Sequence, residues 1–342
     1  MYAANVVYAK VHALYGRRLS EADYNQLLQK KSVGEVAGYL KQNTAYAGVL
    51  REIREELIHR GQLENLVHRH RADICGRLLK YTLGRDFFYG LYAMQNEIRQ
   101  LLAAMRMLRS GSMDRYVVDF PPYLNQYLSI DLFALAGIRS FDDLLEVVRH
   151  SDYYALLGAI RPVGGAGELD LPGCEATLLT HYYKTALAAA GTLRGGARSD
   201  LERILRLQAD LHNIRVIYRL KRFFHFSPDE TRACLVPVKG NLPQAFMDRL
   251  VNAGNAEQVL ALLAQARRTR RFFHAGTQDP EQASHRLQRD VSLRAFRFSS
   301  DPIVVLLAYM ALLEIEVDNI IGIIEGIRYA LPPEQIRELL IL

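Results

Sequence analysis

Asn319-Ile-Ile-Gly-Ile-Ile-Glu-Gly-Ile-Arg328 is the stretch that decides the fold, because its pattern occurs three times in the chain. The other copies read Asn213-Ile-Arg-Val-Ile-Tyr-Arg-Leu-Lys-Arg222 and Glu97-Ile-Arg-Gln-Leu-Leu-Ala-Ala-Met-Arg106. In each copy a polar anchor is followed by apolar or aromatic residues at offsets one, four and five, and by arginine at offset nine. Offsets one, four and five share one face of a helix, whereas nine steps of about 100° carry the arginine to the opposite face. Each copy therefore predicts an amphipathic helix with an apolar seam and an outward-facing cation.

A second pattern occurs upstream of each of these helices. It reads Ser32-Val-Gly-Glu-Val36, Ser140-Phe-Asp-Asp-Leu144 and Asn255-Ala-Glu-Gln-Val259. A side-chain acceptor followed three residues later by an acid or an amide is typical of a capped helix start. These starts are 108 and 115 residues apart, and the anchors of the long helices are 116 and 106 residues apart. The agreement predicts three similar modules, which we place at residues 1–112, 113–226 and 227–342.

Helix-forming sequence fills the rest of each module and predicts an all-α fold. Leu57–Met107 contains no proline, and Glu281–Arg297 and Ile303–Tyr329 flank a break at 299–302. Cys174–Ala190 is separated from Ser199–Phe224 by breaks at Gly191 and at Gly195-Gly196. Asp301 or Ser300 is a plausible cap for the last long helix, with Pro302 in its first turn. Each module is therefore expected to be a set of short capped helices that leads into a pair of long antiparallel helices.

Composition limits the class of protein. The chain has 342 residues, of which half are apolar, so it can bury a large core. Its longest strongly apolar run, Ile303–Leu313, has eleven residues, fewer than the roughly 20 that a membrane span needs. No signal peptide is visible, and the three widely separated cysteines fit neither a disulfide framework nor a metal site. We therefore expect a soluble protein of a reducing compartment.

Arginine dominates the mild net charge of +6, because only eight of the 43 basic residues are lysine. Arginine pairs with carboxylates through a planar fork and is favoured at protein interfaces. A genome that prefers arginine codons would explain the same bias.

The sequence shows no catalytic, cofactor-binding or metal-binding motif, so we predict neither an enzyme nor a small-molecule substrate. The nearest approach to a phosphate-binding loop is Pro162-Val-Gly-Gly-Ala-Gly-Glu168, which lacks the lysine and the preceding strand and is interpreted as a connector. His68 and His70 would point about 200° apart on a helix, which argues against a shared metal. His181 and His212 are expected to be packed or half-exposed histidines.

One basic run, Arg267-Arg-Thr-Arg-Arg-Phe-Phe-His274, combines arginines with aromatic residues. That combination could bind nucleic acid. The solvated end of a helix, where cations complement the helix dipole, accounts for it more simply. Two alternative functions stay open at this point, namely a helical-repeat scaffold for a partner protein and a basic helical nucleic-acid-binding protein.

Several segments in order along the chain resemble a known family. The opening Tyr8-Ala-Lys-Val-His-Ala-Leu-Tyr-Gly-Arg-Arg-Leu-Ser20 and the segment from Ser32 to Leu40 are similar to the start of the C subunits of prokaryotic V-type (V/A-type) ATPases. This family corresponds to the d subunits of eukaryotic V-ATPases. Asp210-Leu-His-Asn-Ile-Arg215, Glu314-Ile-Glu-Val-Asp-Asn-Ile320 and Leu331-Pro-Pro-Glu-Gln-Ile336 resemble its later segments.

The resemblance implies a funnel-like body of three helical modules around a pseudo-threefold axis. It also implies a non-catalytic central-stalk subunit of a rotary V/A-type ATPase or ATP synthase, peripheral to the membrane on its cytoplasmic face. The implied partners are the rotor ring of membrane subunits and the central shaft subunits, with no nucleic acid and no cofactor. We take Arg106, Arg222 and Arg328 as candidate interface residues, although capping or solvation near the ends of long helices would also explain them.

Overall fold

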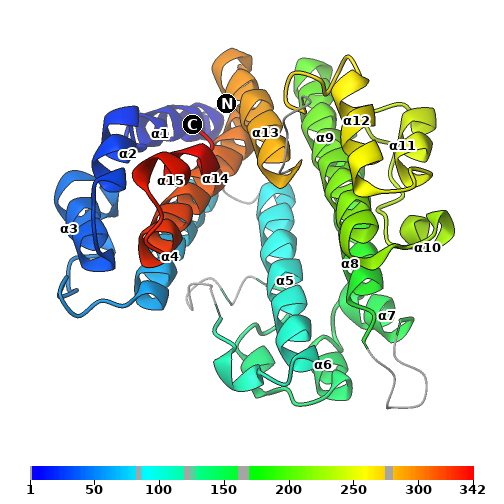
Figure 1. The fold of residues 1–342 in the computed structure, drawn as a ribbon, viewed down its shortest axis with the longest axis horizontal. Coiled ribbons are helices and arrows are strands. Elements are labelled where there is room, and N and C mark those ends of the chain that lie inside the picture. The colour runs from blue at the N-terminus through cyan, green and yellow to red at the C-terminus, as the bar shows by residue number, and fades with distance from the viewer. Residues whose placement is uncertain (1, 82–85, 119–124, 126–127, 161–168, 274–279) are drawn as a thin grey trace. The chain divides into compact units, whose positions relative to one another are not determined.

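The chain is helical throughout the part that the structure, a computed structural model, describes. That part comprises residues 2–81, 86–118, 125, 128–160, 169–273 and 280–342, and no β-strand occurs within it (Figure 1). The all-α prediction is confirmed.

The chain divides into two compact units. Unit 1 contains residues 1–85 and 285–342, and unit 2 contains residues 86–284. Unit 1 is thus built from both ends of the sequence. The predicted module boundaries, at 112/113 and 226/227, both fall inside unit 2, and the three-module division stays a prediction.

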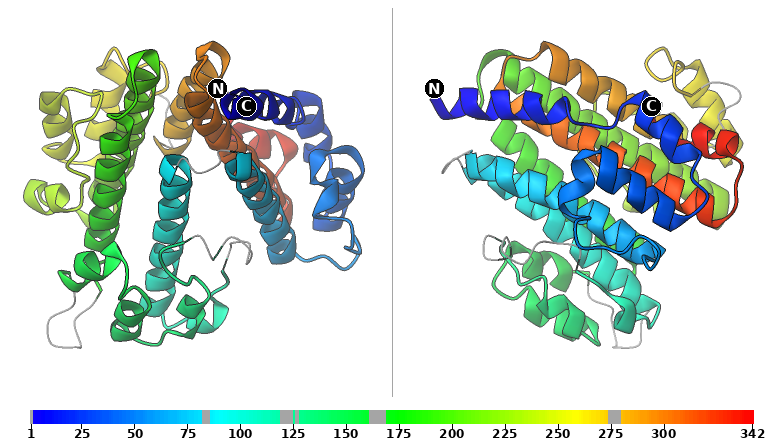
Figure 2. Two further views of the ribbon diagram at one scale, coloured as in Figure 1. Left: turned by 180° about the vertical axis from the view of Figure 1, so that it is seen from behind. Right: turned by 90° about the vertical axis from the view of Figure 1, so that its left-hand side faces the viewer.

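Unit 1 is organised around one long helix, α14 (Pro302–Arg328), which begins at the predicted cap Asp301. Its other elements are α1 (Tyr2–Tyr15), α2 (Glu21–Leu28), α3 (Val33–Asn43), η1 (Ala45–Gly48), α4 (Arg60–Tyr81), most of α13 (Pro280–Phe298) and α15 (Pro333–Leu339). α14 packs against α1 and α4 (Figure 2). The core of the unit also takes apolar residues from α2, α3 and α15.

Unit 2 contains three long helices, α5 (Asp86–Arg109), α8 (Leu171–Ala190) and α9 (Gly195–Arg219). α8 packs against both α5 and α9. The shorter elements are η2 (Met113–Arg115), η4 (Ala134–Gly137), α6 (Phe141–Val147), α7 (Asp152–Gly158), the π-helical turn η5 (Leu220–Phe224), α10 (Pro228–Ala233), α11 (Gln244–Val251) and α12 (Ala256–Gln265).

The start of α9 differs from the prediction. The sequence indicated a second break at Gly195-Gly196, yet α9 begins at Gly195, so only residues 191–194 separate it from α8. Gly195 adopts a left-handed φ of 62° at the first position of the helix. A glycine accepts that conformation without the steric cost of a side chain, so it starts the helix here instead of interrupting it.

The three predicted helix starts are confirmed and share one hydrogen-bond pattern. The side chains of Ser32, Ser140 and Asn255 accept from the amides of Glu35, Asp143 and Gln258 at 3.1, 3.1 and 2.9 Å. The side chains of Glu35, Asp143 and Gln258 accept in turn from the backbone amide of the residue that precedes the cap, at 2.9, 2.7 and 2.8 Å. Each start therefore pairs two amides that a helix terminus would otherwise leave unpaired.

The three apolar seams are also confirmed. All residues at offsets one, four and five are buried except Tyr218, which is half-buried. The buried residues are Ile98, Leu101 and Leu102 in the first copy, Ile214 and Ile217 in the second, and Ile320, Ile323 and Ile324 in the third. Burying a large aliphatic side chain stabilises a fold by about 1.5–3 kcal/mol. The seams therefore contribute to holding the long helices in place.

Candidate functional site

The polar anchors of the repeated helices lie buried, and each holds a loop that comes later in the chain. Asn213 and Asn319 do so in the same way. The carboxamide oxygen of Asn213 accepts from the amide of Val236 at 2.9 Å, and its nitrogen donates to the carbonyl of the same residue at 3.0 Å. Asn319 makes the equivalent pair with Ile341, at 2.8 and 3.1 Å. Each asparagine therefore pairs both backbone groups of a single residue, and we call this arrangement an asparagine clasp.

Glu97 occupies the matching position in α5 but bonds differently, because a carboxylate cannot donate. One of its oxygens accepts from the amide of Ser129, and the other accepts from the Tyr153 hydroxyl at 2.7 Å. A tyrosine on α7 therefore replaces the backbone carbonyl as the second partner. The departure from asparagine that the sequence showed at this position has a direct structural counterpart.

A buried carboxylate stands one helical turn before each asparagine. Asp210 accepts from the amides of Asn241 and Leu242 at 2.7 and 2.9 Å. Burial raises the pKa of its carboxyl group to about 6, against the opposing effect of these hydrogen bonds. Gly240 lies so close to this carboxylate that a Cβ atom there would overlap it.

Glu316 is the corresponding acid in α14. It accepts from the amide of Leu19 at 3.0 Å, from the Arg18 guanidinium at 3.1 Å and from the Tyr46 hydroxyl at 3.2 Å. Burial raises the pKa of Glu316, and the positive charge of Arg18 acts in the opposite direction. The α14 acid thus fixes the loop that leads into α2.

The sequence reasoning identified the asparagines as anchors but missed Asp210 and Glu316. The signal was present, because each acid precedes its asparagine by three residues on a helix that is otherwise apolar along this face. An acid in that position requires hydrogen-bond partners from outside the helix. The arrangement is structural in character, because it fixes loops to the long helices.

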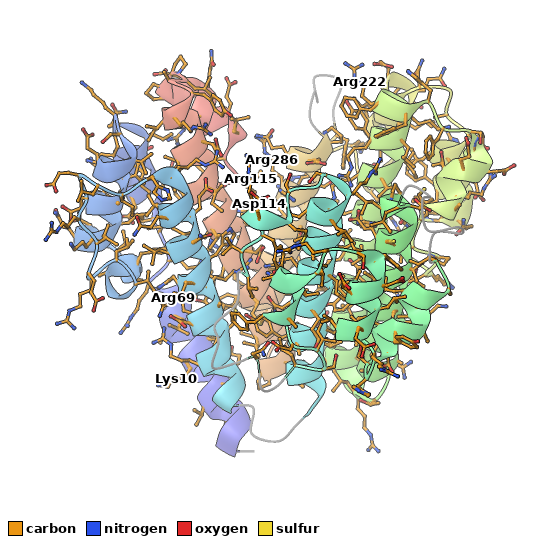
Figure 3. The ribbon with its side chains drawn as sticks, turned by 90° about the horizontal axis from the view of Figure 1, so that it is seen from below. Lys10, Arg69, Asp114, Arg115, Arg222 and Arg286 are labelled. Carbon is orange, nitrogen blue, oxygen red and sulfur yellow. The ribbon has the colours of Figure 1, made fainter. Side chains whose placement is uncertain are left out.

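The three candidate interface arginines all point outward. The side chains of Arg106, Arg222 and Arg328 are 57%, 53% and 50% exposed. They pair with different acids, namely Glu175 at 3.9 Å, Glu257 at 2.8 Å and Glu325 at 3.9 Å. Arg222 lies in η5, the π-helical turn that follows α9, at the edge of unit 2 (Figure 3). The predicted outward orientation is confirmed. The ion pairs of these arginines are made within the chain, so they do not test the predicted role at an interface.

Exposed aromatic residues follow two of these arginines. Phe223 and Phe224 are 66% and 63% exposed after Arg222, and Tyr329 is 66% exposed after Arg328. A left-handed φ of 53° follows in both cases, at His225 directly after η5 and at Ala330, the second residue after α14. Arginines beside aromatic side chains are enriched where proteins bind one another. The turn η5 and the end of α14 therefore have the composition of a protein interface.

The three cysteines are buried, and so are two of the histidines, His70 and His212. Burial raises the pKa of the Cys174 thiol to about 12 and lowers the pKa of His70 and His212 to about 4 and about 3. Among the residues that the structure describes, no group of three His, Cys, Asp or Glu side chains could hold a metal ion. The connector 162–168 lies outside the described residues.

The long helices are too polar or too short to be membrane spans. Within the described ranges, none of the helices combines the length and the apolar character needed to cross a bilayer.

Comparison with known proteins gives a match along almost the whole chain. The sequence model of the family described as ATP synthase (C/AC39) subunit matches residues 7–339. The chain is 21% identical over 237 residues to the C subunit of the A-type ATP synthase of Methanosarcina mazei, covering 68% of this chain and 64% of the relative. It is 22% identical over 225 residues to the protein of the same name from Methanosarcina acetivorans, covering 64% of this chain and 59% of the relative. The matched part thus spans less than two thirds of either relative.

Proposed function

Because this chain belongs to the ATP synthase (C/AC39) subunit family, we propose that it is a non-catalytic central-stalk subunit of a V/A-type rotary ATPase. In this proposal it is a socket that couples the rotor shaft to the membrane ring, on the cytoplasmic face of the membrane. ATP chemistry and ion passage belong to other subunits. The observation that carries the proposal is the family match over residues 7–339. The same match favours this function over a nucleic-acid-binding protein.

The packing of the chain supports a mechanical task. A part that transmits torque must resist deformation, and helices packed along apolar seams are stiff because protein interiors are close-packed. The asparagine clasps and the buried acids add fixed points, since each ties a loop to a long helix at a defined position. Three quasi-equivalent modules in a pseudo-threefold, funnel-like body would let such a part touch several ring subunits at once.

Arg106, Arg222 and Arg328 are the proposed contact residues for ring or shaft. Each is half-exposed, and two of them stand beside exposed aromatic side chains. Exposed ion pairs contribute only about 0–1 kcal/mol to stability, so these arginines are free to exchange their internal partners for acids of another subunit. Docking through such contacts weakens as salt is added.

Depletion and add-back tests the coupling function. We expect membranes that lack the subunit to hydrolyse ATP but to build no ATP-driven ion gradient, because shaft rotation no longer reaches the ring. Addition of the purified chain should restore the gradient. Membranes that pump ions equally well without the subunit would refute the proposal.

The contact residues need a separate experiment. We expect the variant Arg106→Ala/Arg222→Ala/Arg328→Ala to keep its stability and to bind the depleted complex more weakly. The control is Arg51→Ala/Arg54→Ala/Arg194→Ala, which removes three other exposed arginines. Equal affinity of the two variants would remove the three candidates while leaving the coupling function intact.

A further inference from the structure

Basic side chains gather around the loop from Val238 to Leu242 in unit 2. The Arg206 guanidinium donates to the carbonyl of Lys239 at 2.9 Å, and Arg268 donates to the carbonyl of Asn241. Asn241 also donates from its side chain to the carbonyl of Arg203 at 2.7 Å. Two arginines from α9 and one from the turn after α12 are thereby held at a single loop.

We call this group the basic patch. It comprises four residues that these contacts place at the loop, Arg203, Arg206, Lys239 and Arg268, and two that flank Arg268 in the same turn, Arg267 and Arg270. Five of the six are exposed, and Arg206 is partly buried. Three carboxylates contact it, namely Asp200 on Arg203, Glu202 on Arg206, and Asp210 beneath the loop. Six cations against three carboxylates leave three positive charges, half of the chain's formal +6.

Half of the patch cations have no partner among the residues that the structure describes. Lys239, Arg267 and Arg270 make no ion pair and no side-chain hydrogen bond within the described part of the chain. Like charges held close together repel, and exposed cations without counter-charges leave that repulsion in place. The patch therefore gains free energy from any ligand that brings negative charge to it.

The turn that carries these arginines is rigidly held. Thr269 is buried, and its hydroxyl donates to the carbonyl of Leu263 at 2.6 Å. Phe273 is fully buried at the end of the same turn. The buried residues fix the backbone of the turn, so a ligand that binds the neighbouring exposed arginines has to order their side chains but not the backbone.

The chemistry of the surroundings selects the kind of ligand. Phe273 is not available for stacking on bases, which single-stranded nucleic-acid sites require. None of the exposed large apolar side chains in the described residues lies in α9, in the loop from Val238 to Leu242 or in the turn at residues 266–273, so the segments that carry the patch offer none for insertion into a membrane. Carboxylates on a protein surface remain the ligand that matches this group, in which six cations outnumber the three contacting carboxylates.

We propose that the basic patch is a docking surface for an acidic segment of another subunit of the same complex. The carboxylates of that segment pair with Lys239, Arg267 and Arg270. This inference rests on the proposed function, because it takes the partner from within the rotary complex. It names a second set of contact residues, different from Arg106, Arg222 and Arg328.

Rebinding to the complex, depleted of this subunit and purified from its source organism, tests the inference. The patch variant is Lys239→Gln/Arg267→Gln/Arg270→Gln in the full chain. The control is Lys31→Gln/Arg51→Gln/Arg54→Gln, which removes three exposed cations whose side chains likewise pair with nothing in the described ranges. Both variants lower the formal charge from +6 to +3, so any effect of total charge is the same.

We expect the control to bind like the wild type and the patch variant to bind about tenfold more weakly, at roughly a factor of two per lost pair. The affinity of the patch variant should also fall less steeply with salt.

Equal binding of all three proteins would overturn the docking surface and leave the proposed function intact. A wild-type chain that never rebinds would overturn the proposed function itself. If the patch variant binds the complex normally but loses wild-type binding to duplex DNA or to phosphatidylglycerol vesicles, the ligand is not a protein and the inference fails.

Discussion

Asn319→Ala is the substitution that tests the asparagine clasp most directly. The carboxamide of Asn319 pairs the amide and the carbonyl of Ile341, and Leu340 beside it is packed into the core of unit 1. Alanine leaves two buried backbone groups without partners, at about 1–3 kcal/mol each. The chain can avoid that cost only by releasing residues 340–341 to water, and each exposed side chain then costs about 1.5–3 kcal/mol. Both routes predict that the free energy that holds residues 340–341 in place falls by about 3 kcal/mol, near the lower end of the two ranges.

Hydrogen exchange measures this loss where it occurs. A change of about 3 kcal/mol corresponds to an increase of about 100-fold in the population of the open segment, because 1.4 kcal/mol is a factor of ten. We therefore expect the amide of Ile341 to exchange about 100 times faster in the variant. Asn213→Ala should accelerate the exchange of Val236 in the same way, because that clasp has the same two hydrogen bonds.

Asn43→Ala is the matched control. Its carboxamide donates to the carbonyl of Tyr39 on the surface of α3 at 3.2 Å, and water can replace that bond. We expect it to cost less than about 0.5 kcal/mol. Unchanged protection of Ile341 in Asn319→Ala, or an equal acceleration in both variants, would refute the clasp reasoning.

Three further substitutions test the packing, a helix end and a buried acid. Gly326→Ala should lower the free energy of unfolding in urea by about 1–3 kcal/mol, because a Cβ atom would come within 2.6 Å of Ile336. The control is Gly90→Ala, where a Cβ atom would meet nothing within 4 Å, and it should raise the free energy of unfolding by up to about 1 kcal/mol. Ala330→Gly should raise it by about 0.5–1 kcal/mol, since the φ of 53° suits glycine; unchanged stability would contradict this. Asp210 should destabilise the fold as pH rises from its ordinary pKa of 3.8 through its folded pKa of about 6, because the folded state holds the proton more tightly. The difference corresponds to about 3 kcal/mol, so urea unfolding of the wild type should lose stability between about pH 4 and pH 7 relative to Asp210→Asn, and parallel pH profiles would contradict the burial argument.

Local features were predictable from the sequence because a few neighbouring residues determine them. A serine or asparagine with an acid or amide three residues later defined each cap, and those bonds form within one turn. Helical periodicity likewise identified the seam from Ile320 to Ile324, which is buried as expected. The outward direction of Arg328 followed from the same geometry.

Long-range partners were not predictable, because periodicity does not say which loop an anchor will meet. Nothing in the sequence around Asn319 points to Ile341, 22 residues away. The π-helical turn Leu220–Phe224 was also missed. It inserts one residue without disturbing the pattern of side chains before it, and His225 accordingly lies one residue further from Asn213 than Ala330 lies from Asn319.

Unit 1 draws on residues 1–85 and 285–342, with unit 2 between them, and this order has a consequence for biosynthesis. The ribosome delivers the two halves of unit 1 about 200 residues apart, which at about 5–20 residues per second is a delay of at least ten seconds. During that interval α2, α3 and α4 have emerged without α14, so the apolar faces that later receive Ile320 and Ile324 stay open to solvent. Residues 86–284 are synthesised before residues 285–342, so we expect residues 1–85 to be the part of the nascent chain that exposes unpaired apolar surface to chaperones for longest.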